Sequence, residues 1–159
     1  MQEPRRIWWA RPRKLCALER PGGGGRSHRP ERRSGEIGYL RERGVRLVVS
    51  LMPTRHNLAA YDAAGLPWRH LPVDGPAALE ELLTLLRREL RGRGAVAVHG
   101  DRRTGLAAAV CAAHLHEARG EDPAAALAAA AASGLDVDAE ACGLVGVDPA
   151  DMKRRLSAR

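Results

Sequence analysis

The chain has 159 residues, of which 45% are hydrophobic and 28% are charged, and its formal net charge is +7. This length and apolar content suit one globular domain with its own core and exclude a wholly disordered chain. The Ala-rich apolar stretches are shorter than the roughly 18 residues a membrane span needs, and the first residues lack the apolar core of a secretory signal. Three scattered cysteines suit neither a disulfide framework nor a zinc site. We therefore expect a cytoplasmic protein with no membrane attachment, no metal and no cofactor.

The position of the positive charge argues against nucleic acid as the partner. Residues 1–33 contain ten basic and three acidic residues, whereas residues 34–159 contain 16 of each, so the main body is electrically neutral. A net charge of this size can attract polyanions, but no nucleic-acid recognition motif accompanies it. Sequence-independent nucleic-acid binding through residues 1–33 is therefore only a third hypothesis.

The first half of the chain predicts strands alternating with short helices. Residues 21–35, PGGGGRSHRPERRSG, contain no apolar residue, and four consecutive glycines favour a flexible basic loop that could contact an acidic partner. Residues 45–51, VRLVVSL, form a nearly continuous apolar run typical of a buried parallel strand. The other predicted strands are residues 7–9, 15–18 and 68–73, and the predicted helices are residues 36–43 and 56–64.

The second half predicts a strand followed by several helices. Five leucines between residues 79 and 86 make one apolar stripe and predict a helix over residues 77–91. Residues 95–99, AVAVH, predict a second buried strand. Further helices are predicted over residues 106–117, 123–132 and 149–156, the last two with Pro in the first turn.

This order predicts an α/β fold: a compact single domain over residues 1–159 with a central, mainly parallel sheet and helices on both faces. In such sheets the ligand site lies at the carboxyl ends of the strands. Two segments have that position, namely residues 73–76 (VDGP) and residues 100–105 (GDRRTG).

Residues 95–110, AVAVHGDRRTGLAAAV, place a buried strand, a short polar loop and a helix in succession. Backbone N–H groups and the positive end of the helix then meet at one point, which favours an anion site. Arginine adds a planar guanidinium suited to phosphate or carboxylate. The alternative is that the arginines are solvated and Asp101 caps the helix. The candidate anion-binding residues are Gly100, Arg102, Arg103, Thr104 and Gly105.

From Arg6 to about Ala132, the chain resembles the atypical dual-specificity phosphatases of the protein tyrosine phosphatase superfamily. RIWWARPRKLCALERPG resembles their opening strand pair, and LRERGVRLVVSLMP resembles their L-x-x-x-G-V-x-x-V-V-S-L segment. GLPWRHLPVDGPAALEELLTLL is similar to their strand, general-acid loop and following helix. AVAVHGDRRTGLAAAVCAAHL is similar to their signature strand, phosphate loop and helix. The resemblance implies the phosphatase fold and a phosphate-type ligand.

The signature segment departs from the family pattern, His-Cys-x-x-Gly-x-x-Arg-[Ser/Thr]-Gly. Here it reads His99-Gly100-Asp101-Arg102-Arg103-Thr104-Gly105, three residues shorter, and the missing piece contains the nucleophilic cysteine. In the family reaction a thiolate attacks phosphorus within a cradle of N–H groups. An arginine holds the equatorial oxygens, and an aspartate protonates the leaving oxygen. The resemblance assigns these last two roles to Arg103 and Asp74.

Two further side chains could carry chemistry without the thiol. Asp101 could act as a nucleophile or base, although pairing with an arginine or capping the helix is the alternative. His99 could act as a base or phosphate acceptor, although family members carry a histidine there that supports the loop. Asp74 could equally be a simple turn residue.

The sequence thus predicts a non-hydrolytic phosphatase-like protein that binds an anionic, phosphorylated ligand or a protein partner. The alternative is an enzyme with cysteine-independent chemistry on an anionic small molecule, using Asp74, His99, Asp101 and Arg103. A bacterial metabolic pathway would suit its small size. The sequence leaves the oligomeric state open.

Overall fold

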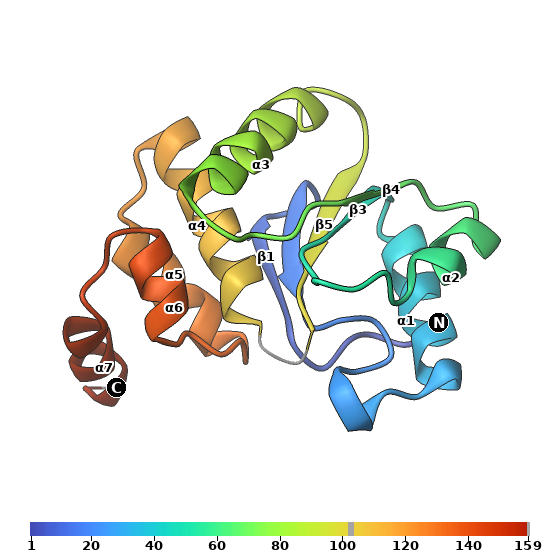
Figure 1. Ribbon diagram of the computed structural model, residues 1–159, viewed down its shortest axis with the longest axis horizontal. Helices are drawn as coiled ribbons and strands as arrows, with labels where there is room; N and C mark the ends of the chain where they lie inside the picture. The colour runs from blue at the N-terminus through green and yellow to red at the C-terminus, as the bar shows by residue number, and fades with distance from the viewer. Residues whose placement is uncertain (102–103, 159) are drawn as a thin grey trace.

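A computed structural model describes residues 1–101 and 104–158, and it contains a mainly parallel five-stranded sheet in the order β1-β2-β5-β3-β4. Only the β1–β2 pair is antiparallel, because a short turn joins these strands directly. This sheet confirms the predicted α/β class (Figure 1). The strands are β1 (Ile7–Arg11), β2 (Leu15–Leu18), β3 (Val45–Ser50), β4 (Trp68–His70) and β5 (Ala95–His99).

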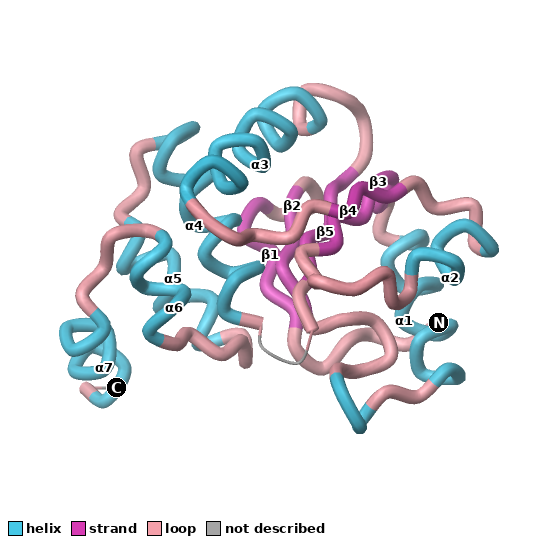
Figure 2. The backbone as a smooth tube through the Cα atoms, viewed as in Figure 1, coloured by secondary structure: helices cyan, strands magenta, loops and turns pink. Residues whose placement is uncertain are grey.

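Helices cover both faces of the sheet, as the alternation of strands and helices predicts (Figure 2). Because successive strand side chains point to opposite faces, β2 sends Leu15 and Ala17 into one core and Cys16 and Leu18 into the other. The helices are α1 (Pro30–Glu42), α2 (Leu58–Ala63), α3 (Pro76–Glu89), α4 (Gly105–Arg119), α5 (Pro123–Ala132), α6 (Ala139–Leu144) and α7 (Pro149–Ser157).

The smaller core lies between the sheet and helices α1 and α2. Ile37 and Leu40 of α1 and Tyr61 of α2 pack there against Leu18 and Val48 of the sheet. Tyr61 is fully buried, so its hydroxyl group needs a polar partner inside the protein.

The larger core lies between the sheet and helices α3 to α7. Helix α4 presents Ala107, Ala108 and Cys111 to this core, all with no exposed surface. These small side chains let α4 lie close to the strands, and α5 and α6 in turn contact α4. The first residue of α4 follows the end of β5 after a connection of only five residues, so the core fixes where the two ends of that connection lie.

Most predicted elements are shifted at their ends by one to six residues, and the larger differences lie in three places. The loop predicted over residues 21–35 is wrong for residues 30–35, which form the first turns of α1 because Pro30 starts that helix. A short 3-10 helix, η1 (Gly25–Ser27), also lies in this segment. Strand β4 ends at His70 rather than Val73. Helix α6 was not predicted, since six residues are too few for a clear apolar period.

No helix within residues 1–101 and 104–158 has the length and apolar character to cross a lipid bilayer.

The larger core yields a stability prediction. Leu86 of α3 is fully buried in it, so Leu86→Ala should lower the free energy of unfolding by about 2–5 kcal/mol in urea titrations. Glu81 is exposed on the same helix, and Glu81→Ala is the control expected to change stability by less than about 0.5 kcal/mol. Equal effects of the two substitutions would contradict the orientation of α3.

Candidate functional site

The candidate site lies where β5 ends and α4 begins. Residues 100–104 connect the two elements, with His99 as the last strand residue and Gly105 as the first helical residue. Of the predicted anion-binding residues, Arg102 and Arg103 lie outside the described part of the chain. The structure places Gly100, Thr104 and Gly105, as well as the candidate catalytic residues.

His99 is fully buried beneath this connection, and both of its ring nitrogens have partners. Nδ1 lies 2.8 Å from the carbonyl oxygen of Gly100, and Nε2 lies 2.8 Å from the hydroxyl oxygen of Tyr61. Since a carbonyl can only accept, Nδ1 carries the proton and Nε2 accepts the Tyr61 hydroxyl proton. Burial, assisted by the positive charge of Arg20, lowers the pKa of His99 to about 4. His99 is therefore neutral near pH 7 and holds the loop in place.

Asp101 lies beside the segment that follows β2. Its Oδ1 accepts a hydrogen bond from the backbone N–H of Gly25 at 3.1 Å and lies 3.6 Å from Nη1 of Arg20. The Arg20 side chain is only 9% exposed, whereas that of Asp101 is 42% exposed. The structure thus gives Asp101 an arginine partner, which is the alternative that the sequence left open for this residue.

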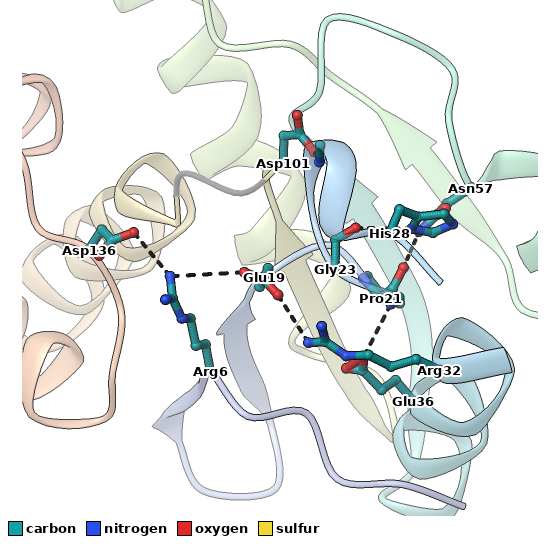
Figure 3. A network of polar contacts seen from close by, with 12 residues as sticks. Arg6, Glu19, Pro21, Gly23, His28, Arg32, Glu36, Asn57, Asp101 and Asp136 are labelled. Atoms are coloured by element: carbon teal, nitrogen blue, oxygen red, sulfur yellow. Dashed lines mark hydrogen bonds and ion pairs between the residues drawn. The ribbon is translucent and has the colours of Figure 1, made fainter. Parts of the chain in front are cut away.

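The glycine-rich segment after β2 is the part of the site that the sequence reasoning missed. Pro21 and the next three glycines are buried, and buried side chains hold their backbone. Asn57 Nδ2 donates to the carbonyl oxygen of Pro21 at 2.8 Å, and Gly22 N–H donates to Oε1 of Glu36 at 3.1 Å. Figure 3 shows these side chains gathered around the segment.

We call residues 21–25 of this segment the glycine loop. Its position follows from the pairing of β2 with β5, in which Leu18 lies opposite His99. Pairing of residues 15–18 with residues 95–99, combined with the Pro-Gly run after residue 20, would have predicted that the glycine loop lies beside the β5–α4 connection.

A chain of ion pairs continues from the glycine loop to the far side of the site (Figure 3). Glu36 lies 2.6 Å from Nε of Arg32, whose Nη2 lies 3.0 Å from Glu19. Arg6 lies 3.9 Å from Glu19 and 3.3 Å from Asp136. Burial raises the pKa of Glu36, and the neighbouring Gly22 N–H and Arg32 oppose that rise. Charged groups therefore alternate in sign across this face, which limits repulsion among the many arginines.

Thr104 and Gly105 are buried beneath the segment that precedes α6. Thr104 Oγ1 accepts the backbone N–H of Asp136 at 2.6 Å. A Cβ atom added to Gly105 would lie 2.6 Å from the carbonyl oxygen of Asp136 and 3.0 Å from Oδ1 of Asp138. A glycine is thus required at the start of α4 by close approach of another part of the chain.

Asp74 lies on the loop between β4 and α3. It is exposed and makes no hydrogen bond or ion pair with any residue that the structure describes. Together with Leu79, Leu106 and Glu140 it lines a cleft of about 420 Å³. Since Leu106 is the second residue of α4, Asp74 faces the same end of that helix as the β5–α4 connection.

The three cysteines lie away from the connection. Cys16 is in β2, Cys111 in α4 and Cys142 in α6, and all three are buried. Burial is the main cause that raises the pKa of each thiol, so each stays protonated near pH 7. Among residues 1–101 and 104–158, no group of three His, Cys, Asp or Glu side chains is arranged to hold a metal ion.

No family model and no curated protein sequence matches the chain. Solved structures do match along nearly its whole length. Human DUSP28 superposes with a TM-score of 0.67 and 21% identity, covering 98% of this chain and 97% of its own. The chain has the dual-specificity phosphatase fold.

Two structures with bound ligands also share this fold. Pseudomonas (P.) aeruginosa TpbA, as a Cys-to-Ser variant in complex with pTyr, has a TM-score of 0.68 and 21% identity over 99% of this chain and 94% of its own. PTPMT1 in complex with PI(5)P has a TM-score of 0.65 and 14% identity over 97% of this chain and 98% of its own. At these identities the likeness establishes the fold alone.

The burial of His99 makes stability depend on pH. Because folding lowers its pKa from 6.5 to about 4, the unfolded chain binds more protons in that range, and stability falls as pH drops from 6.5 toward 4. From pH 7 to pH 4.5 this group should contribute a loss of roughly 2 kcal/mol.

Urea titrations at the two pH values measure this loss, and His99→Gln should reduce it by that amount. His28 and His114, whose pKa values are also lowered mainly by burial, act in the same direction and remain in both proteins. An unchanged pH dependence in His99→Gln would contradict a neutral, buried His99.

The close approach at Gly105 gives a second prediction. Gly105→Ala should lower the free energy of unfolding by about 1–3 kcal/mol, because its methyl group would collide with the Asp136 backbone. Gly143 in α6 has nothing within 4 Å of an added Cβ, so Gly143→Ala should be neutral or stabilise by up to about 1 kcal/mol. Thermal or urea unfolding compares the two, and a harmless Gly105→Ala would refute the packing of residues 136–138 on α4.

Proposed function

We propose that this chain is a phosphatase-fold protein that binds a phosphorylated or similarly anionic ligand at the β5–α4 connection without hydrolysing it. One observation carries the proposal. The connection joins a buried strand to a helix N-terminus in only five residues, GDRRT, which include arginines but no cysteine. An N-terminal helix end with adjacent arginine favours an oxyanion, while the missing thiol removes the usual nucleophile.

The setting of the cysteines supports the non-hydrolytic part of the proposal. Cys16 lies opposite Ala97 within the sheet, and Cys111 lies in the core side of α4, so neither has a route to a ligand outside. Their thiols are protonated near pH 7 because burial raises their pKa values. A thiolate nucleophile would need exposure and a stabilising positive charge, and these thiols lack that exposure.

Two other structures with this fold contain phosphorylated ligands, and they support an anionic ligand for this chain. TpbA is in complex with pTyr and PTPMT1 is in complex with PI(5)P, and each of these ligands has a phosphate group. In this chain Arg103 is the proposed side chain that holds the phosphate. The predicted anion-binding set also contains Gly100, Arg102, Thr104 and Gly105. A protein partner bearing phosphate or carboxylate groups would bind the same donors.

The second hypothesis, cysteine-independent catalysis by Asp74, His99, Asp101 and Arg103, has weaker support. His99 has both ring nitrogens engaged and no exposed surface, so Nε2 could take a proton from a ligand only by losing the hydrogen bond that it accepts from Tyr61. The Asp101 carboxylate faces Arg20 and Gly25. Of the candidate catalytic residues that the structure describes, Asp74 alone is exposed and without a described ion-pair partner, and one carboxylate does not supply both a nucleophile and an acid.

The binding proposal predicts stabilisation by phosphate or vanadate. At a concentration ten times the dissociation constant, the free energy of unfolding should rise by about 1.4 kcal/mol, which a thermal-shift titration at constant ionic strength detects. Arg103→Ala should abolish the shift. Arg91→Ala, an exposed arginine in the connection that precedes β5, is the matched control and should retain it. No shift at millimolar anion in the wild-type protein would count against the site.

The same preparations should show no turnover of p-nitrophenyl phosphate. Robust turnover that is lost in Arg103→Ala but kept in Cys111→Ser would replace the binding proposal with the cysteine-independent enzyme.

A further inference from the structure

A carboxylate of the protein itself lies against two anion-binding groups beside the candidate site. The feature begins with the parallel pairing of β2 and β5, where Leu18 lies opposite His99. The pairing continues past both strands, because the backbone N–H of Arg20 donates to the carbonyl oxygen of Asp101 at 3.4 Å. Arg20 and Asp101 therefore lie side by side, each two residues beyond its strand.

Arg20 is a buried charge with little opposing it. The residue is 7% exposed, and its Nε donates to Oδ1 of Asn57 at 3.2 Å, a neutral partner. Among the described residues, the Asp101 carboxylate is the acidic group within ion-pair distance of its guanidinium. Asn57 is also held in place, since its Nδ2 donates to Pro21 and to Tyr61. The Arg20 guanidinium is thus buried and hydrogen-bonded to a side chain that is itself anchored.

The backbone of the glycine loop supplies a second donor at the same point. Gly25 N–H donates to Oδ1 of Asp101 at 3.1 Å, so a guanidinium and an amide converge on one carboxylate oxygen. A fixed guanidinium with a backbone N–H is a donor set that binds oxyanions in general. The Asp101 side chain is 42% exposed, so it can rotate into solvent, whereas the Arg20 side chain is only 9% exposed.

We propose that the Asp101 carboxylate is a tethered anion that occupies a second oxyanion site made by Arg20 and the Gly25 amide, and that a ligand phosphate competes with it there. This inference rests on the proposed function, since the ligand is the one expected at the β5–α4 connection that contains Asp101. Arg20 becomes a ligand-binding residue that the family resemblance does not assign. Asp101 sets the affinity by competing for that residue.

A purely structural role for the ion pair predicts a different response. If Asp101 only holds the glycine loop, Asp101→Asn lowers stability, and inorganic phosphate stabilises the variant no better than the wild-type protein. If Asp101 competes with a ligand, the same variant frees the site, and phosphate replaces the lost carboxylate. Asparagine keeps the shape and can still accept the Gly25 N–H bond, so only the charge is removed.

The experiment is a thermal-shift titration with inorganic phosphate at fixed ionic strength, made on four proteins. Asp101→Asn should reach any given rise in unfolding temperature at about one fifth of the phosphate concentration that the wild-type protein needs for the same rise, since a partly exposed ion pair no longer competes. The double variant Arg20→Gln/Asp101→Asn should lose that gain. Asp122→Asn is the matched control, because Asp122 also lies 3.6 Å from an arginine, Arg155, on the far helices, and should behave as wild type.

Each outcome is decisive. Tighter phosphate binding in Asp101→Asn that disappears with Arg20→Gln supports the tethered anion, even if the wild-type protein shows no shift and the proposed function fails. A wild-type shift that Asp101→Asn does not improve overturns the tethered anion and leaves the proposed function standing. A gain that survives Arg20→Gln, or that Asp122→Asn shares, places the phosphate elsewhere and overturns the inference. No shift in any protein overturns both.

Discussion

The parallel hydrogen bonding between β2 and β5 is the constraint on which the site depends. It brings the end of β2 level with the end of β5, so that the glycine loop and the β5–α4 connection leave the sheet side by side. Everything polar in this region then follows from geometry: Arg20 meets Asp101, Asn57 reaches Pro21, and Tyr61 reaches His99. Without that register the positive charge of residues 1–33 would have no defined relation to the connection.

The buried polar groups also explain why a basic, glycine-rich segment is compact here. Burying a guanidinium or amide without a hydrogen-bond partner destabilises the folded state, because the group loses its hydrogen bonds to water. Each buried polar group therefore favours the one arrangement of its neighbours that supplies its partners. Glu36 fixes Gly22, and Arg32 balances Glu36. The segment is therefore defined by side chains from α1 and α2 rather than by its own sequence, which contains almost no apolar residue.

The sequence predicted the fold because its central elements carry strong local signals. The apolar runs of β3 and β5 are typical of buried parallel strands, and the leucine stripe of α3 has a helical period. Their alternation with helices predicts a mainly parallel sheet, whereas the order of the strands was not predicted from the sequence. The site was less predictable. Arg20, Asn57 and Tyr61 have no local motif, since each acts through a residue more than 30 positions away. Composition alone favoured a flexible loop where tertiary contacts bury four residues in succession, and the covering of Thr104 by Asp136 has no signal in either segment.

The contact between Asp136 and the start of α4 has a consequence for how such a site can change. Thr104 ends the connection and Gly105 begins α4, yet their surroundings are supplied by a segment about thirty positions later, in the part of the chain where the resemblance to phosphatases fades. Substitutions near Asp136 can thus reshape the helix entrance while the connection itself stays unaltered. Under the proposed binding function, substitutions in residues 136–138 would change the ligand preference, and comparison of residues 100–105 alone would not detect that change.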